Sequence, residues 1–123
     1  MIVLLGRPVP KKNNSRIVRR GRFVSVIPSK AFVTYEESCL KQLKSYTEKH
    51  NGIMWVKCQY WLPDKRWYPD LVNLLSASHD ILEKAGIIDN DRNIISVDGS
   101  QIMGFDKENP RAEITIIPLS DHV

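Results

Sequence analysis

The segment from Tyr68 to Asn93 constrains the fold more than any other part of the chain, because it predicts one helix with both ends marked. Asp70 stands where an N-cap residue belongs, since its side chain can accept a hydrogen bond from the free backbone N–H groups of a first turn. Gly86 is a typical stop signal. The segment therefore predicts a helix over 71–85 with one buried face. The residues at core-facing spacing are Leu71, Leu74, Leu75, Ser78, Ile81, Leu82 and Ala85.

A long helix and a strand are predicted before this segment. Ser29 is a plausible N-cap, apolar residues follow it at helical spacing, and Asn51–Gly52 is typical of a helix end. Residues 53–62 are apolar nearly throughout, which predicts a central strand buried on both faces.

Shorter β-rich runs complete the pattern. Two of them flank residues 19–22, Arg-Arg-Gly-Arg, and predict a hairpin with arginines at its tip. Another run is interrupted near Asp98–Gly99. The predicted fold class is α+β: one domain over residues 1–123, with a mixed β-sheet, a basic β-hairpin and two helices. The predicted short strands cover residues 2–6, 17–18, 23–27, 94–97, 101–103 and 114–117.

Composition excludes several classes of protein. No apolar run approaches the roughly 20 residues of a membrane span, so we expect no membrane partner. The first residues are too short an apolar segment for a signal peptide, which favours a cytoplasmic location. Cys39 and Cys58 lack the spacing of a zinc site, and we expect both to be buried, reduced thiols.

Positive charge is concentrated near the N-terminus of a chain whose formal net charge is +4. Eight cations and no acid lie between Arg7 and Lys30. Such a block repels itself unless a polyanion neutralises it, and nucleic-acid phosphates are the usual partner. An ordinary basic hairpin without a ligand is the alternative. The predicted DNA contacts are Lys11, Lys12, Asn13, Asn14, Arg16, Arg19, Arg20, Arg22, Lys30, Lys65 and Arg66.

Acidic residues gather in and after the second helix of this basic chain. Carboxylates inside a positive surface can bind Mg²⁺, or Mn²⁺ in its place, and the ion can activate water against a phosphodiester. Asp70 and Asp80 lie roughly 15 Å apart along a helix, so they cannot share one ion. Asp91 could approach Asp70 if the chain after Gly86 runs back along the helix, or if a second subunit supplies it.

The stretch PDLVNLLSASHDILEKAGIIDNDRNI resembles the signature of RusA-type Holliday junction resolvases. The matching residues are Asp70, Leu71, Asn73, Leu74, Asp80, Leu82, Gly86 and Asp91. The N-terminal run Pro8-x-Pro10 with Lys12-Asn13-Asn14, and the run Val26-x-Pro28-Ser29-Lys30, also resemble the family.

The resemblance implies a small, homodimeric, Mg²⁺-dependent endonuclease that cuts four-way DNA junctions symmetrically in recombination and repair. Many relatives are encoded by phages or prophages. The family's second acid and its catalytic lysine fall at Val72 and Ser76 here, so one ligand and one cation differ.

The predicted site residues follow from the pattern and the resemblance together. Asp70, Asp91 and Asp89 are the predicted catalytic and metal-binding residues, with Asp98 as an alternative third carboxylate. Asn73, Asp80 and Lys84 are predicted to support them, with Arg92 or Lys65 as other sources of the cation. Trp61, Trp67 and Phe23 could stack on bases, although packing is the alternative for Trp61.

Three functions are open at this stage. The first is a junction-resolving endonuclease. The second is a DNA-binding protein of the same fold whose metal site has decayed through Val72 and Ser76. The third is a nuclease that acts on flaps or other branched DNA.

Overall fold

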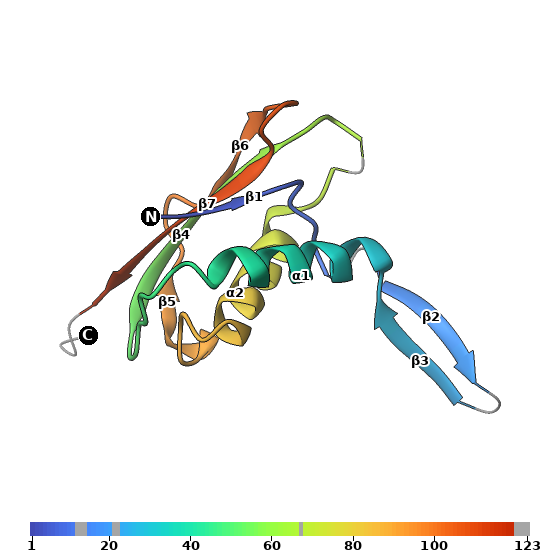
Figure 1. The fold of residues 1–123 in the computed structure, drawn as a ribbon, viewed down its shortest axis with the longest axis horizontal. Coiled ribbons are helices and arrows are strands. Elements are labelled where there is room, and N and C mark those ends of the chain that lie inside the picture. The colour runs from blue at the N-terminus through green and yellow to red at the C-terminus, as the bar shows by residue number, and fades with distance from the viewer. Residues whose placement is uncertain (12–14, 21–22, 67, 120–123) are drawn as a thin grey trace.

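Two helices and a mixed five-stranded sheet form two layers in the computed structural model (Figure 1). The structure describes residues 1–11, 15–20, 23–66 and 68–119. This arrangement confirms the predicted α+β class. The elements are β1 (Ile2–Leu5), β2 (Ser15–Arg20), β3 (Phe23–Pro28), α1 (Lys30–Leu43), β4 (Met54–Leu62), α2 (Leu71–Lys84), the short 3₁₀ helix η2 (Asp91–Asn93), β5 (Ile94–Ser96), β6 (Gln101–Phe105) and β7 (Arg111–Pro118).

The helices cover one face of the sheet, and the core lies between the two layers. Burial alternates along β4, so Val56, Cys58 and Tyr60 are buried while the residues between them are half-buried. The prediction that residues 53–62 are buried on both faces is therefore wrong. The apolar run has another cause: Trp55 and Trp61 lie on the uncovered face, where their large side chains are only partly shielded.

β4 is the central strand, with the sheet order β1-β7-β4-β5 and β6 also paired to β4. β4 runs antiparallel to β7 and parallel to both β5 and β6. The chain leaves the sheet between β5 and β6 at Gly99, whose φ of 83° favours glycine. Ser100 Oγ accepts a hydrogen bond of 2.9 Å from the Cys58 N–H, which keeps β4 paired across the gap. The predicted interruption near Asp98–Gly99 is confirmed.

The outer edge of β1 is covered by side chains from α1 and the segment after it. Gln42 Oε1 accepts from the Leu5 N–H at 2.8 Å, and Gln42 Nε2 donates to the Leu5 carbonyl at 3.0 Å. The Tyr46 hydroxyl accepts from the Val3 N–H at 3.1 Å. These contacts satisfy backbone groups that would otherwise be open to another strand.

α1 ends earlier than the sequence predicted. Ser29 is its N-cap, as predicted, and accepts from the Phe32 N–H at 3.2 Å. The helix stops at Leu43 rather than near Asn51–Gly52. The physical reason is tertiary: Tyr46 is bonded to β1, and His50 forms an isolated parallel bridge with Ile88, which requires extended backbone.

The predicted hairpin is present as β2 and β3, a separate two-stranded antiparallel sheet. It projects away from the two-layer body (Figure 1). Arg16, Arg19 and Arg20 lie in β2, and only their backbone is described. Arg22, Trp67 and the predicted contacts Lys12, Asn13 and Asn14 lie outside the described residues, as does the side chain of Phe23.

Both cysteines are buried and reduced, as predicted. Burial raises the pKa of the Cys39 thiol to about 11 and that of the Cys58 thiol to about 12. Both thiols are therefore protonated near neutral pH and pack as small apolar groups. Among the described helices, none is long and apolar enough to cross a membrane.

Candidate active site

α2 carries the predicted acidic residues and is fixed to the sheet at its middle. The Tyr60 hydroxyl lies 2.7 Å from Ser78 Oγ and 3.1 Å from the Leu74 carbonyl, and all of these groups are buried. This network joins β4 to two successive turns of α2. Because it sets the rotation of the helix about its axis, it decides which α2 residues face solvent.

Asp70 is the N-cap of α2, as predicted. Its Oδ1 accepts from the Asn73 N–H at 2.8 Å, and its Oδ2 accepts from Asn73 Nδ2 at 2.9 Å. The residue is exposed and lies at the positive end of the helix dipole. Asn73 thus holds the Asp70 carboxylate in one orientation. Each carboxylate has about four lone-pair sites, so its oxygens retain capacity for an external ligand.

Asp91 lies beside the C-terminal half of the same helix. Its N–H donates to Glu83 Oε1 at 3.2 Å, and its charge acts on His79. The positions from His79 to Glu83 lie about 14 to 20 Å from Asp70 along the helix axis, at 1.5 Å per residue. The chain after Gly86 therefore places Asp91 beside the C-terminal half of α2, whereas Asp70 caps the N-terminus of the helix.

His79 is a feature that the sequence reasoning missed. Burial lowers the pKa of the His79 imidazole, and the nearby Asp91 carboxylate acts in the opposite direction. Its Nε2 is buried and has no hydrogen-bond partner among the described residues. A histidine between core-facing Ser78 and exposed-side Asp80 gave no motif, so only the position of η2 against α2 reveals this electrostatic interaction with Asp91.

Asp89 holds the loop before η2. Its oxygens accept from Asn93 Nδ2 at 3.1 and 3.2 Å, from the Asn90 N–H at 2.9 Å and from the Gly52 N–H at 3.4 Å. These bonds, led by that from Asn93, lower the pKa of the Asp89 carboxyl. A role as a metal ligand would have to compete with them.

Of the other two acidic candidates, Asp80 pairs through its carboxylate, whereas Asp98 makes its hydrogen bonds through its backbone. Asp80 Oδ2 lies 3.7 Å from Lys11 Nζ, which links α2 to the segment that leads into the hairpin. Asp98 lies in the turn between β5 and β6, where its carbonyl accepts from Trp55 Nε1 at 2.9 Å and its N–H donates to Ser96 Oγ at 3.3 Å. Asp98 thus shapes that turn.

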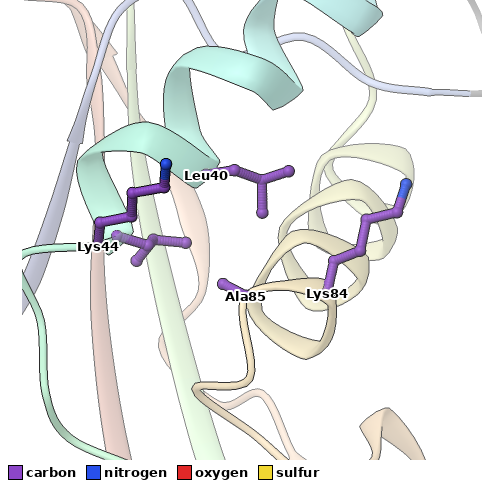
Figure 2. A pocket seen from close by; sticks show the side chains of 5 residues that line it. Leu40, Lys44, Lys84 and Ala85 are labelled. Carbon is purple, nitrogen blue, oxygen red and sulfur yellow. The ribbon is translucent and has the colours of Figure 1, made fainter.

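Lys84 lies at the far end of α2 from Asp70. Its Nζ pairs with Glu36 Oε1 of α1 at 3.0 Å. A groove of about 270 Å³ separates the two helices at this end, with an apolar floor that includes Leu40 and Ala85 and with Lys44 and Lys84 at its sides (Figure 2). Lys84 thus joins the helices, and the structure places it away from the Asp70 carboxylate.

Val72 and Ser76 are both exposed on α2, and the exposed fraction of Val72 is 73%. They lie one helical turn apart and therefore on one side of the helix. These are the positions at which the resemblance implied an acid and a lysine. Both positions are exposed to solvent here, but Val72 is apolar and Ser76 is uncharged.

The loop before Asp70 carries cations and an aromatic residue in solvent. Lys65 and Arg66 are exposed, as expected for DNA contacts. Tyr68 and Phe105 form an edge-to-face pair with ring centroids 6.2 Å apart and with 58% and 45% of their surfaces exposed. The sequence reasoning named neither ring. Trp61, which it did name, lies under the guanidinium of Arg111 at 4.1 Å.

A metal site within one chain would need several ligand side chains close together. Within residues 1–11, 15–20, 23–66 and 68–119, no group of three or more His, Cys, Asp or Glu side chains is placed to hold a metal ion. The described residues of a single chain therefore do not form a three-carboxylate Mg²⁺ site of the kind that the resemblance implies.

Comparison with known proteins identifies the family. A family model described as endodeoxyribonuclease RusA matches residues 6–117, which include both helices and the described strands β2 to β6. A search of curated proteins gave no match. Because the family model covers nearly the whole chain, the chain belongs to the RusA endodeoxyribonuclease family.

Proposed function

We propose that the protein resolves four-way DNA junctions by paired, symmetrical cleavage of two strands. Membership of an endodeoxyribonuclease family supports hydrolysis of DNA. The observation that carries the proposal is the Asp70 carboxylate, exposed and held by Asn73 directly after a loop with two exposed cations, Lys65 and Arg66. A fixed carboxylate within a cationic surface suits a reaction on a DNA phosphate.

The same surface supports recognition of DNA. The cationic block between Arg7 and Lys30 includes the hairpin, which projects where it can reach a duplex (Figure 1). The exposed ring of Tyr68, two residues before Asp70, could stack on an unpaired base, since such stacking tolerates any sequence. Unpaired or distorted bases occur where duplex arms meet, which favours a branched substrate.

We further propose that a homodimer completes the site. In one chain Asp70 caps the start of α2 and Asp91 lies beside its C-terminal half, whereas a two-fold dimer could bring Asp70 of one protomer to Asp91 of the other. A two-fold dimer would also present two equal sites to a nearly two-fold junction. In this proposal Asp70 and Asp91 are ligands of Mg²⁺, for which Mn²⁺ could substitute, because hard divalent cations prefer carboxylate oxygens. Asp89 then serves chiefly to hold the η2 loop.

A cleavage assay tests the proposed activity. Purified protein is incubated with a synthetic four-way junction, a flap and a linear duplex, with Mg²⁺, with Mn²⁺ and with EDTA. We expect paired nicks at symmetrical positions of the junction, with a divalent ion only, and no nicks from Asp70→Asn. Preferential cutting of the flap in a competition between substrates would instead support the flap nuclease.

A second candidate function rests on Val72 and Ser76. Their exposed side chains supply neither an acid nor a cation on the surface next to Asp70. A protein with this fold could then bind junctions without cutting them. Tight junction binding with no nicks in any divalent ion would favour this second candidate.

A further inference from the structure

The loop between β4 and α2 is held in shape from two sides. Asp64 Oδ1 accepts from the Arg66 N–H at 2.8 Å, which closes a tight turn, and Asp64 Oδ2 accepts from the Arg66 guanidinium at 3.2 Å. From the other side, Arg7 donates to the Arg66 carbonyl at 2.7 Å. Arg7 follows β1 in the sequence, so this bond fixes the loop to the end of the sheet.

Three cations therefore meet at this loop, because Arg7, which is distant in the sequence, joins the neighbours Lys65 and Arg66. We call Arg7, Lys65 and Arg66 the loop surface. Asp64 offsets one of the three charges, and the charge of Arg7 adds to the Arg66 contacts that lower the pKa of the Asp64 carboxyl. The Arg66 side chain is 82% exposed in its pair with Asp64. Such exposed pairs are weak, so an external anion can displace the carboxylate from Arg66 readily.

The loop surface lies where it could contact DNA. The loop leads directly into Asp70, and buried Pro69 joins the two. The hairpin β2–β3 and this loop project from the same end of the molecule in different directions (Figure 1). A straight duplex that lies along the hairpin would leave the loop cations unmatched, whereas a branched substrate offers a second arm in another direction.

We propose that the loop surface binds the phosphate backbone of a second duplex arm, while the hairpin holds the first, and that this division produces selectivity for branched over linear DNA. The inference rests on the proposed action on DNA junctions. It assigns to Arg7 a positioning role, because the bond from Arg7 orders the loop that presents Lys65 and Arg66 beside Asp70.

The test measures binding without cleavage. Affinities are measured by fluorescence anisotropy in EDTA, between about 50 and 200 mM salt. The two ligands are an immobile four-way junction and a linear duplex that has the sequence of two of its arms. We expect Lys65→Ala/Arg66→Ala to weaken junction binding about tenfold and to lower its salt slope by about 1.8, since each phosphate contact contributes about 0.9. The affinity for the duplex should change less than about twofold, because in this proposal the hairpin binds the duplex.

The matched control is Lys41→Ala/Lys44→Ala, which removes the same charge from exposed positions at the far end of α1. It should leave both affinities close to those of the unchanged protein. Equal losses for junction and duplex in the loop variant, or an unchanged junction affinity and salt slope, would overturn the proposal. Because the readout needs no divalent ion, the proposal can fail or hold independently of the cleavage activity.

The role of Arg7 is tested separately. Arg7→Ala removes one charge and also releases the Arg66 carbonyl, so it should weaken junction binding more than Lys65→Ala, which removes one charge only. An effect equal to or smaller than that of Lys65→Ala would show that Arg7 does not order the loop. Far-ultraviolet circular dichroism and thermal melts confirm that each variant is folded.

Discussion

The two ends of α2 carry carboxylates in contrasting settings. At its start, Asp70 is exposed, has Asn73 as a partner and follows a cationic loop. Near its end, Asp91 lies against Glu83 and beside half-buried His79, in a loop held by Asp89. Under the proposed function, each end would supply one part of a site: a carboxylate presented to DNA at the first, and a carboxylate in a hydrogen-bonded polar loop at the second.

The largest expected effect is on cleavage, and it should distinguish Asp91 from Asp89, the two acids near the C-terminal end of α2. Asp91→Asn should lower the rate of junction cleavage at least about 100-fold, because loss of a group that only supports a metal ligand already costs up to about 100-fold. Asp89→Asn should lower it less, since the oxygens of Asp89 are used within the loop. Single-turnover cleavage measures both rates. A larger loss in Asp89→Asn than in Asp91→Asn would reverse the roles given to these two residues.

The next effect is a loss of stability when the hydrogen bonds that hold the middle of α2 to the sheet are removed. Tyr60→Phe removes the buried hydroxyl that bonds Ser78 and the Leu74 carbonyl. The loss should destabilise the fold by about 1 kcal/mol, the usual net value of a buried hydrogen bond. Urea denaturation measures the change, and the melting temperature should fall by about 4 °C. Unchanged stability would mean that this network does not fix the helix on the sheet.

A smaller, pH-dependent effect is expected from His79. Its folded-state pKa lies below its usual value, so the unfolded chain takes up a proton that the folded one resists. Stability should be complete above about pH 6.5, the pKa of an unperturbed histidine, and should fall with pH below it until the folded pKa is reached. His79→Gln should flatten this part of a plot of melting temperature against pH. An identical plot for the two proteins would contradict the claim that burial lowers the pKa of His79.

The smallest effect should come from Lys84. Its side chain is 54% exposed in the pair with Glu36, so screening by solvent limits the contribution of the pair to less than about 1 kcal/mol. Lys84→Ala should therefore change neither cleavage by more than about twofold nor stability beyond that limit. Lys41→Ala is the control for loss of a lysine near a helix end. A large loss of cleavage in Lys84→Ala alone would restore Lys84 as the cation of the site.

Local features could be predicted from the sequence, whereas features that depend on distant neighbours could not. The caps Ser29 and Asp70 were predictable because each bonds a backbone group only three residues away. The early end of α1 was not, because Tyr46 and His50 are bonded to β1 and to Ile88. The half-exposed face of β4 depends on which face the helices cover, and residue periodicity over an apolar run does not reveal that.

The site divides in the same way. Asp70 and its partner Asn73 follow from one helix start, and their contact is local. The path of the chain after Gly86, which leaves Asp91 beside Glu83 rather than Asp70, depends on the bridge between His50 and Ile88. The electrostatic interaction between Asp91 and His79 and the hydrogen bond between Arg7 and Arg66 join segments whose sequence contains no signal for each other.

Subunit complementation tests whether each site combines Asp70 of one protomer with Asp91 of its partner. Asp70→Asn and Asp91→Asn chains with different tags are co-expressed, and the mixed dimer is purified through both tags. One of its two sites then retains both native carboxylates, so we predict restored nicking of one junction strand, while each variant alone stays inactive. A mixed dimer as inactive as its parents would contradict the shared site.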